Sequence, residues 1–170
     1  IVVMFCKKQK ITKFGEIIIG FGILFMGLST MSGAMSGMKD SPTVIHMFAS
    51  LQQPVLAVLL GAVLTAIIQS SSVTVSIMVL MANQGLLGLD MCMFIILGCN
   101  IGACTSALLA SLTGKKDAKR AASIHLIFNV IGTIIVYIIF MACVHQVVGV
   151  LSDIAHQDAG RVVAYAHIAI

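Results

Sequence analysis

An apolar run of helical length ends in four consecutive polar, uncharged residues in the stretch Gly61-Ala62-Val63-Leu64-Thr65-Ala66-Ile67-Ile68-Gln69-Ser70-Ser71-Ser72. Between Ser41 and Gly114 the only charged residue is Asp90, so this break lies inside a membrane-like region. Glutamine and serine are costly at membrane depth unless their dipoles meet a ligand, an ion or other protein groups. The break is therefore a candidate binding site.

The composition is typical of a membrane protein, because 59% of the 170 residues are hydrophobic and only 9% are charged. The net charge of +4 does not indicate nucleic-acid binding, since the basic residues gather in two clusters that flank apolar segments. The five cysteines have no Cys-x-x-Cys spacing, so we expect neither a disulfide framework nor a cysteine metal site. The two clusters are Lys7, Lys8, Lys10 and Lys13, and Lys115, Lys116, Lys119 and Arg120.

Counting membrane crossings predicts a re-entrant hairpin at about residues 55–82. Each of its two apolar arms is shorter than the roughly 20 residues that a crossing requires. If both basic clusters are cytoplasmic, an even number of crossings must separate them, which a hairpin permits and a full span across 55–82 does not. The predicted segments are spans at Ile17–Met35, Leu86–Leu112 and Ser123–Cys143, an outer loop at Ser36–Gln53, and hairpin arms at Val55–Ile68 and Val73–Ala82.

The predicted fold is therefore an all-α membrane protein, built from transmembrane helices and a re-entrant helical hairpin broken at residues 69–72. We expect residues 1–16 to hold the end of a preceding segment and a cytoplasmic basic linker, and residues 17–144 to form one transmembrane repeat. Residues 145–170 are expected to form a loop and the start of a further segment. Because the chain starts without Met and stops in an opening apolar run, we expect a piece of a longer protein.

The chemistry of a broken helix suits an anion and a cation together. A helix that starts near Val73 offers free N–H groups and the positive end of its dipole to an anion. The carbonyls at the end of the preceding arm, with the oxygens of Gln69 and the serines, suit Na⁺, and secondary transporters place substrates at such breaks. A second interruption of similar character is expected at residues 98–102, around Asn100 and before Thr105 and Ser106.

Several motifs in order resemble the type II sodium-dependent phosphate cotransporters and their bacterial relatives. Gln69–Ser72 after Thr65-Ala66 resembles the QSSS signature of that family, and Gly98-Cys99-Asn100-Ile101-Gly102 resembles the G-x-N-I-G motif that follows it. Ala121–Asn129 is similar to the family segment that ends in H-x-x-F-N. Gly20–Leu28 is similar to the helix that opens the second of two inverted repeats.

This resemblance implies one half of an inverted-repeat secondary transporter, a sodium-coupled symporter of inorganic phosphate in which each repeat brings one QSSS hairpin to a shared site. Ala103 and Cys104 stand where the family usually has threonines, and Cys99 stands where serine or alanine is common, which puts the number of sodium ligands in question. The resemblance places phosphate at Gln69, Ser70, Ser71 and Ser72, and Na⁺ at Gln69, Ser70, Cys99, Asn100, Thr105 and Ser106.

The same resemblance implies a protein that is not an enzyme and that needs no cofactor or metal other than Na⁺ as the coupling ion. The expected partners are inorganic phosphate, Na⁺, the lipid bilayer, and the other inverted repeat of the full-length protein or a second copy. No nucleic-acid partner is expected. The expected location is the plasma (inner) membrane, which the chain would cross several times.

Two other classes remain open beside transport. A non-transporting membrane scaffold or assembly subunit would use the serines to join helices. An intramembrane serine hydrolase would need Ser71 as nucleophile and His125 as base, although three serines in a row do not single out one nucleophile. His125 and Asn129, one helical turn apart, are instead predicted to form a structural polar pair through interhelical hydrogen bonds.

Overall fold

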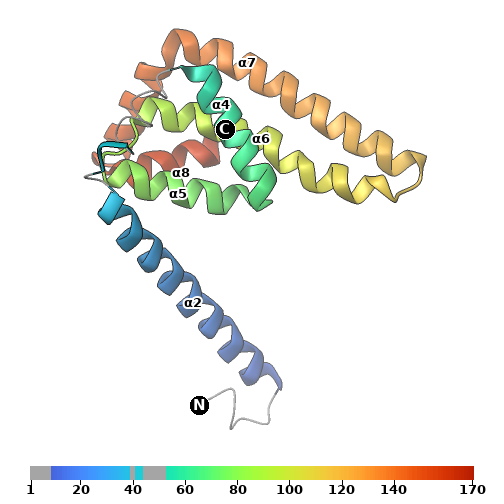
Figure 1. Ribbon diagram of the computed structural model, residues 1–170, viewed down its shortest axis with the longest axis horizontal. Coiled ribbons are helices and arrows are strands. Elements are labelled where there is room, and N and C mark those ends of the chain that lie inside the picture. The colour runs from blue at the N-terminus through green and yellow to red at the C-terminus, as the bar shows by residue number, and fades with distance from the viewer. Residues whose placement is uncertain (1–8, 39–40, 44–52) are drawn as a thin grey trace. The chain divides into compact units, whose positions relative to one another are not determined.

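The computed structural model describes residues 9–38, 41–43 and 53–170, and these residues contain helices but no strands (Figure 1). The chain divides into two compact units, Ile1–Met38 and Lys39–Ile170. Within these described residues, three helices are long and apolar enough to cross a membrane. This confirms the all-α membrane fold that the sequence predicts. Most of the predicted outer loop lies outside the described residues.

The first unit contains one long apolar helix, α2, which runs from Gln9 to Met38. It includes the predicted span at Ile17–Met35 and begins well before it. The described part of the predicted basic linker, residues 9–16, is thus helical and not a separate connection. Lys13 and Glu16 form an exposed ion pair of 3.6 Å one turn apart in this part of the helix, which favours helix over loop.

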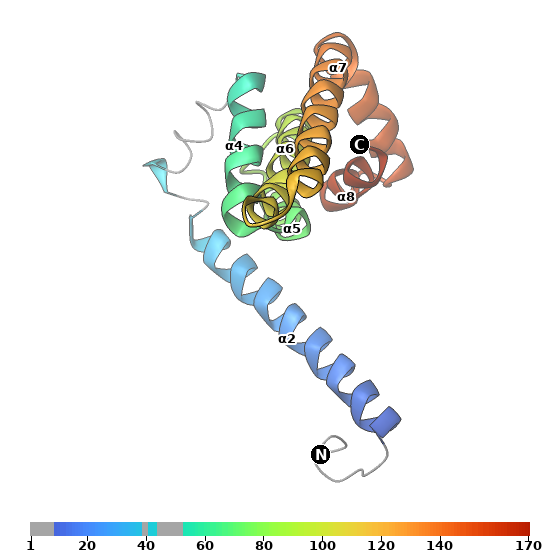
Figure 2. The same ribbon diagram turned by 90° about the vertical axis from the view of Figure 1, so that its right-hand side faces the viewer.

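In residues 53–170, the second unit consists of one central helix and four helices around it. These are α4 (Pro54–Ile68), α5 (Ser71–Asn83), α6 (Leu89–Leu112), α7 (Lys116–Ile154) and α8 (Ala159–Ala169). Helix α6 packs against the other four, and every residue from Cys92 to Cys99 is buried (Figure 2). Because the part of α6 from Cys92 to Cys99 is covered on all sides, it is apolar around its whole circumference instead of along one stripe. This helix is the core of the unit.

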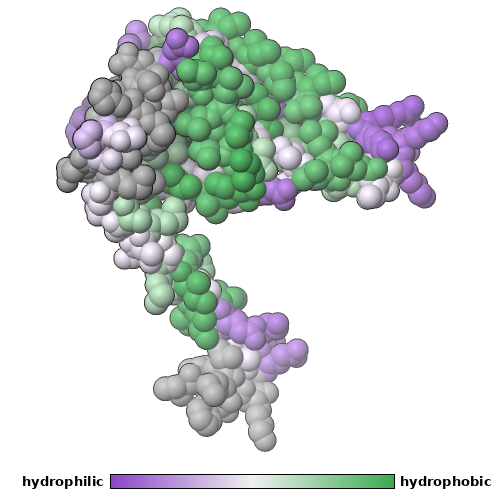
Figure 3. All heavy atoms as spheres, viewed as in Figure 1, coloured by the Kyte–Doolittle hydropathy of each residue, from purple (hydrophilic) through white to green (hydrophobic). Residues whose placement is uncertain are grey.

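The outer faces of the second unit are strongly apolar. Helix α7 exposes large side chains such as Ile127, Phe128 and Ile138, and hydrophobic residues cover the face formed by α4 and α7 (Figure 3). Hydrophilic residues gather at the turn between α6 and α7, where Lys115–Arg120 are exposed. An apolar belt that ends in a basic turn is the pattern of helices that cross a bilayer.

Three glycines bring the backbones of α4 and α6 into direct contact. A Cβ at Gly61 would meet the carbonyl of Ile95, and one at Gly98 would meet the carbonyl of Val58. A Cβ at Gly102 would likewise meet the backbone of α4. Small residues allow this close approach in membrane helices. The predicted interruption at residues 98–102 is therefore wrong: α6 is helical throughout, and its glycines serve packing instead of backbone freedom.

Helix α7 is 39 residues long and has one non-helical residue, Cys143, at φ −138° and ψ 15°. The predicted span thus ends at this kink, but the loop expected from residue 145 begins only at Ala155. Just beyond the kink, the His145 Nδ1 atom lies 3.0 Å from the Asp90 Oδ2 atom in the first turn of α6. The pair joins the second part of α7 to the start of α6.

The short helix α8 starts at a capped turn. The Asp158 carboxylate accepts a hydrogen bond of 2.9 Å from the backbone N–H of Arg161, which satisfies one of the free donors at the helix start. We expect Asp158→Ala to lower the free energy of unfolding by about 1 kcal/mol. Asp153→Ala removes an exposed carboxylate from the last turn of α7 and serves as the control. Thermal unfolding in detergent measures both, and equal midpoints would contradict the capping role.

Candidate functional site

The polar break predicted from the sequence separates α4 from α5. Helix α4 ends at Ile68 and α5 begins at Ser71, so the two helices have 15 and 13 residues. Gln69 adopts a left-handed conformation with φ 58°, and Ser70 is extended with φ −147°. The break in the helix is confirmed, and both helices are short for a crossing. Whether the pair is re-entrant stays a prediction, because it depends on the membrane.

The serines of the break form the start of α5. Ser70 is the N-cap, and its Oγ atom accepts a hydrogen bond of 3.4 Å from the backbone N–H of Val73. Ser71 and Ser72 are the first two helical residues, whose N–H groups have no partner within a helix. The helix therefore begins two residues earlier than predicted, and its positive end lies on the motif itself. The arrangement offers donors to an anion.

The other side of the break offers acceptors. The Gln69 N–H donates to the Thr65 carbonyl over 2.7 Å and closes α4, while the last carbonyls of the helix have no partner further along it. The Gln69 side chain is exposed and Ser70 is half-buried. Carbonyl and amide oxygens at the negative end of a helix dipole attract cations. Donors for an anion and acceptors for a cation thus lie on adjacent residues.

Two buried threonines that sequence analysis did not assign connect the two arms. The Thr65 hydroxyl donates to the Thr74 hydroxyl over 3.1 Å, and Thr74 Oγ1 lies 3.3 Å from the carbonyl of Ser70. Neither threonine is exposed to solvent. One signal was available: Thr65 precedes Gln69 by four residues, and Thr74 follows Ser70 by four, so both lie one turn from the break.

Helix α6 brings one predicted sodium ligand to this threonine pair. The Cys99 thiol is buried beside the Thr65 side chain. Asn100 and Thr105 are half-buried and Ser106 is exposed. Within the part of the chain that the structure describes, no side-chain hydrogen bond joins these three residues to the break. Their assignment to Na⁺ stays a prediction.

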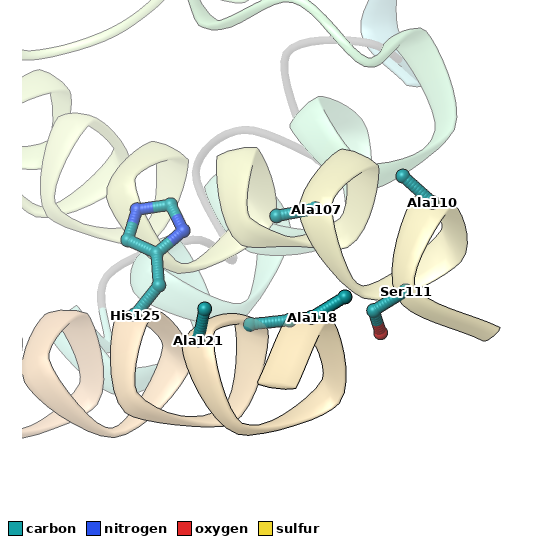
Figure 4. A pocket seen from close by; sticks show the side chains of 7 residues that line it. Ala107, Ala110, Ser111, Ala118, Ala121 and His125 are labelled. Carbon is teal, nitrogen blue, oxygen red and sulfur yellow. The ribbon is translucent and has the colours of Figure 1, made fainter. Parts of the chain in front are cut away.

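The predicted polar pair on α7 is arranged differently from the expectation. The Asn129 side-chain amide donates to the carbonyl of His125 over 2.9 Å, within one helix and not between helices. The His125 ring points toward α6, where its Nε2 atom lies 3.9 Å from the Cys104 thiol (Figure 4). His125 also lines an open groove of about 440 Å³ between α6 and α7, with alanines and Ser111. The interhelical partner of His125 is therefore Cys104.

The helices and the break define an all-α membrane protein whose paired short helices meet at polar residues, an arrangement that secondary transporters use. The family model described as Na⁺/Pi-cotransporter matches residues 38–161, and the chain belongs to this family. The matched residues include the break, α6 and all of α7. They leave out Gly20–Leu28, for which the resemblance stays a prediction.

Three relatives show how far the similarity extends. YqeW, an uncharacterized protein of Bacillus subtilis, is 36% identical over 132 residues, which are 76% of this chain and 42% of that protein. Sodium-dependent phosphate transport protein 2C of Homo sapiens is 42% identical over 88 residues, 49% of this chain and 15% of that protein. YjbB of Salmonella typhimurium, named provisionally for inorganic phosphate export, is 23% identical over 163 residues, 95% of this chain and 29% of that protein.

The chain spans less than half the length of each of these relatives. No solved structure gives a significant match. Members of the family are transporters and not enzymes, which removes the serine hydrolase alternative.

Proposed function

We propose that the protein containing this chain transports inorganic phosphate across the plasma membrane together with Na⁺. The observation that carries the proposal is the position of the motif serines at the N-terminus of α5, where Ser71 and Ser72 present backbone N–H groups and hydroxyls. Phosphate is an anion with several acceptor oxygens, and a helix N-terminus is a favourable place for such a group. The family match and the name of the human relative support phosphate as the substrate.

Sodium is proposed to bind next to the anion, at the end of α4. The carbonyls there and the Gln69 side-chain oxygen are neutral oxygen ligands, and Cys99, Asn100, Thr105 and Ser106 on α6 would complete the coordination. A cation and an anion bound together offset part of each other's desolvation cost. Na⁺ therefore binds first and lowers the electrostatic barrier for phosphate. Alternation of the broken pair between outward- and inward-open arrangements then carries both across.

Uptake of radiolabelled phosphate into vesicles that contain the full-length protein tests this proposal. With Na⁺ outside, we expect uptake that disappears when choline replaces Na⁺. Ser71→Ala removes a hydroxyl that donates to an anion and should lower uptake roughly 10- to 100-fold. Ser123→Ala, an exposed serine on α7, is the matched control and should leave uptake unchanged. Uptake that ignores Na⁺, from folded protein, would refute the coupling.

Export is a second candidate for the direction of transport, since YjbB matches 95% of this chain. Vesicles loaded with labelled phosphate distinguish the two directions. A reversible symporter is expected to release the phosphate when Na⁺ is more concentrated inside the vesicles than outside, with no other energy source. Efflux that proceeds without Na⁺, combined with no Na⁺-driven uptake, would assign the protein to export. A scaffold would show neither flux, and Ser71→Ala would then change only its assembly.

A further inference from the structure

The threonine pair at the break is a buried polar link in an otherwise apolar region. Thr65 and Thr74 have no exposed surface, and their hydroxyls are 3.1 Å apart across the two arms. The Thr74 hydroxyl is also 3.3 Å from the Ser70 carbonyl. Polar groups at such positions are costly unless each has a partner, and valine would fill the same volume without that cost. The presence of two hydroxyls therefore calls for a role beyond packing.

The link reaches three helices. Thr65 lies on α4 against Gly102 of α6, and beside the Cys99 thiol of the same helix. Thr74 lies on the first turn of α5, and its backbone N–H donates a hydrogen bond of 3.2 Å to the Ser70 carbonyl. The rigid contact between α4 and α6 is thus extended by hydroxyl hydrogen bonds to the start of α5. Thr74 lies in the same turn of α5 as the motif serines Ser71 and Ser72.

We propose that Thr65 and Thr74 are positioning residues for the anion site: their hydrogen bond fixes the N-terminus of α5 against α4, so that the N–H groups of Ser71 and Ser72 converge on one ligand. The proposal rests on the proposed function for its effect on transport. It acts through geometry, because neither hydroxyl is exposed to reach a bound ion directly. Donors held in place before binding cost less conformational entropy when the ligand arrives.

Isosteric substitutions separate the hydroxyl from its volume. Thr74→Val removes the hydroxyl and keeps the shape, whereas Thr74→Ser keeps the hydroxyl. Thr133→Val is the matched control, because the buried Thr133 hydroxyl also joins two helices, bonding to the Leu97 carbonyl over 3.3 Å, but on α7. In vesicles, we expect Thr74→Val to raise the KM for phosphate about tenfold at little change in maximal rate. Thr74→Ser and Thr133→Val should retain the wild-type KM.

A second measurement does not depend on transport. Amide hydrogen exchange of the full-length protein, followed by mass spectrometry, reports local opening of residues 69–74. We expect exchange there to rise about tenfold in Thr74→Val and in Thr65→Val, and to stay near the wild-type rate in Thr74→Ser. Exchange at the break in Thr133→Val should be unchanged.

The two readouts separate failure of this inference from failure of the proposed function. Unchanged exchange at residues 69–74 in both valine variants would overturn the positioning role, whatever the protein transports. Faster exchange with no phosphate uptake by the wild type would refute the phosphate function but leave the hydroxyl link intact. If Thr133→Val raised the KM as much as Thr74→Val, the effect would come from weaker packing throughout the second unit, and the inference would also be overturned.

Discussion

Gly98→Ala is expected to lower the free energy of unfolding of the second unit by about 3 kcal/mol. The added Cβ would lie against the Val58 carbonyl and 2.8 Å from the backbone nitrogen of Ala62. These are backbone atoms of a helix, so neither can move aside as the end of a side chain would. Overpacking in a core typically costs up to about 3 kcal/mol, and this contact is at the upper end of that range because α4 and α6 must separate.

The same substitution at Gly132 provides the control. Gly132 lies on α7, and a Cβ there would meet no atom within 4 Å. Because alanine favours helix over glycine by about 1 kcal/mol, Gly132→Ala should leave the protein equally or more stable. Size-exclusion chromatography and thermal unfolding in detergent compare the two variants. Equal stability of Gly98→Ala and the wild type would mean that α4 and α6 are not in direct backbone contact.

Ser71→Asp is expected to abolish phosphate transport while the fold remains stable. A carboxylate in the first turn of α5 interacts favourably with the helix dipole, which stabilises the helix by about 0.3–1 kcal/mol. The same charge repels phosphate, by about 4 kcal/mol at a separation of about 4 Å and an effective dielectric constant of about 20. This corresponds to binding that is weaker by roughly a thousandfold. Stability and transport should therefore change in opposite directions.

Ser71→Asn is the matched control for the charge, because it has nearly the same shape as aspartate and is neutral. Phosphate uptake should be far higher in Ser71→Asn than in Ser71→Asp, with both proteins at wild-type abundance in the membrane. If the two variants transport equally, the charge at residue 71 does not act on the substrate. Phosphate would then have to bind away from the N-terminus of α5.

The main helices of the fold could be predicted from the sequence. The lengths of the apolar segments, and the positions of the polar residues that interrupt them, determine where these helices begin and end. The break at Gln69 and Ser70 was located correctly, since four polar residues in an apolar region have few structural explanations. The second interruption was predicted wrongly. The same glycines are compatible with a bend or with close helix packing, and only the partner helix, through the carbonyls of Val58 and Ile95, decides between them.

Tertiary contacts also explain what was missed at the site. The spacing of Thr65 and Thr74 from the break places each one turn away from it, but their hydrogen bond forms because the chain turns at Gln69. The pairing of His125 with Asn129 was predicted from their spacing, which correctly places both on one helix face. Spacing does not reveal that Cys104 occupies the position opposite the His125 ring.

Equilibrium binding of radiolabelled phosphate to the purified full-length protein tests the central claim most directly, that the break binds the anion and Na⁺ together. The experiment compares Na⁺ with choline, and the wild type with Ser71→Asp and Ser71→Asn. We predict saturable binding that requires Na⁺ and is lost in Ser71→Asp but retained in Ser71→Asn. Binding by Ser71→Asp equal to that of the wild type, or binding in choline equal to that in Na⁺, would contradict the account.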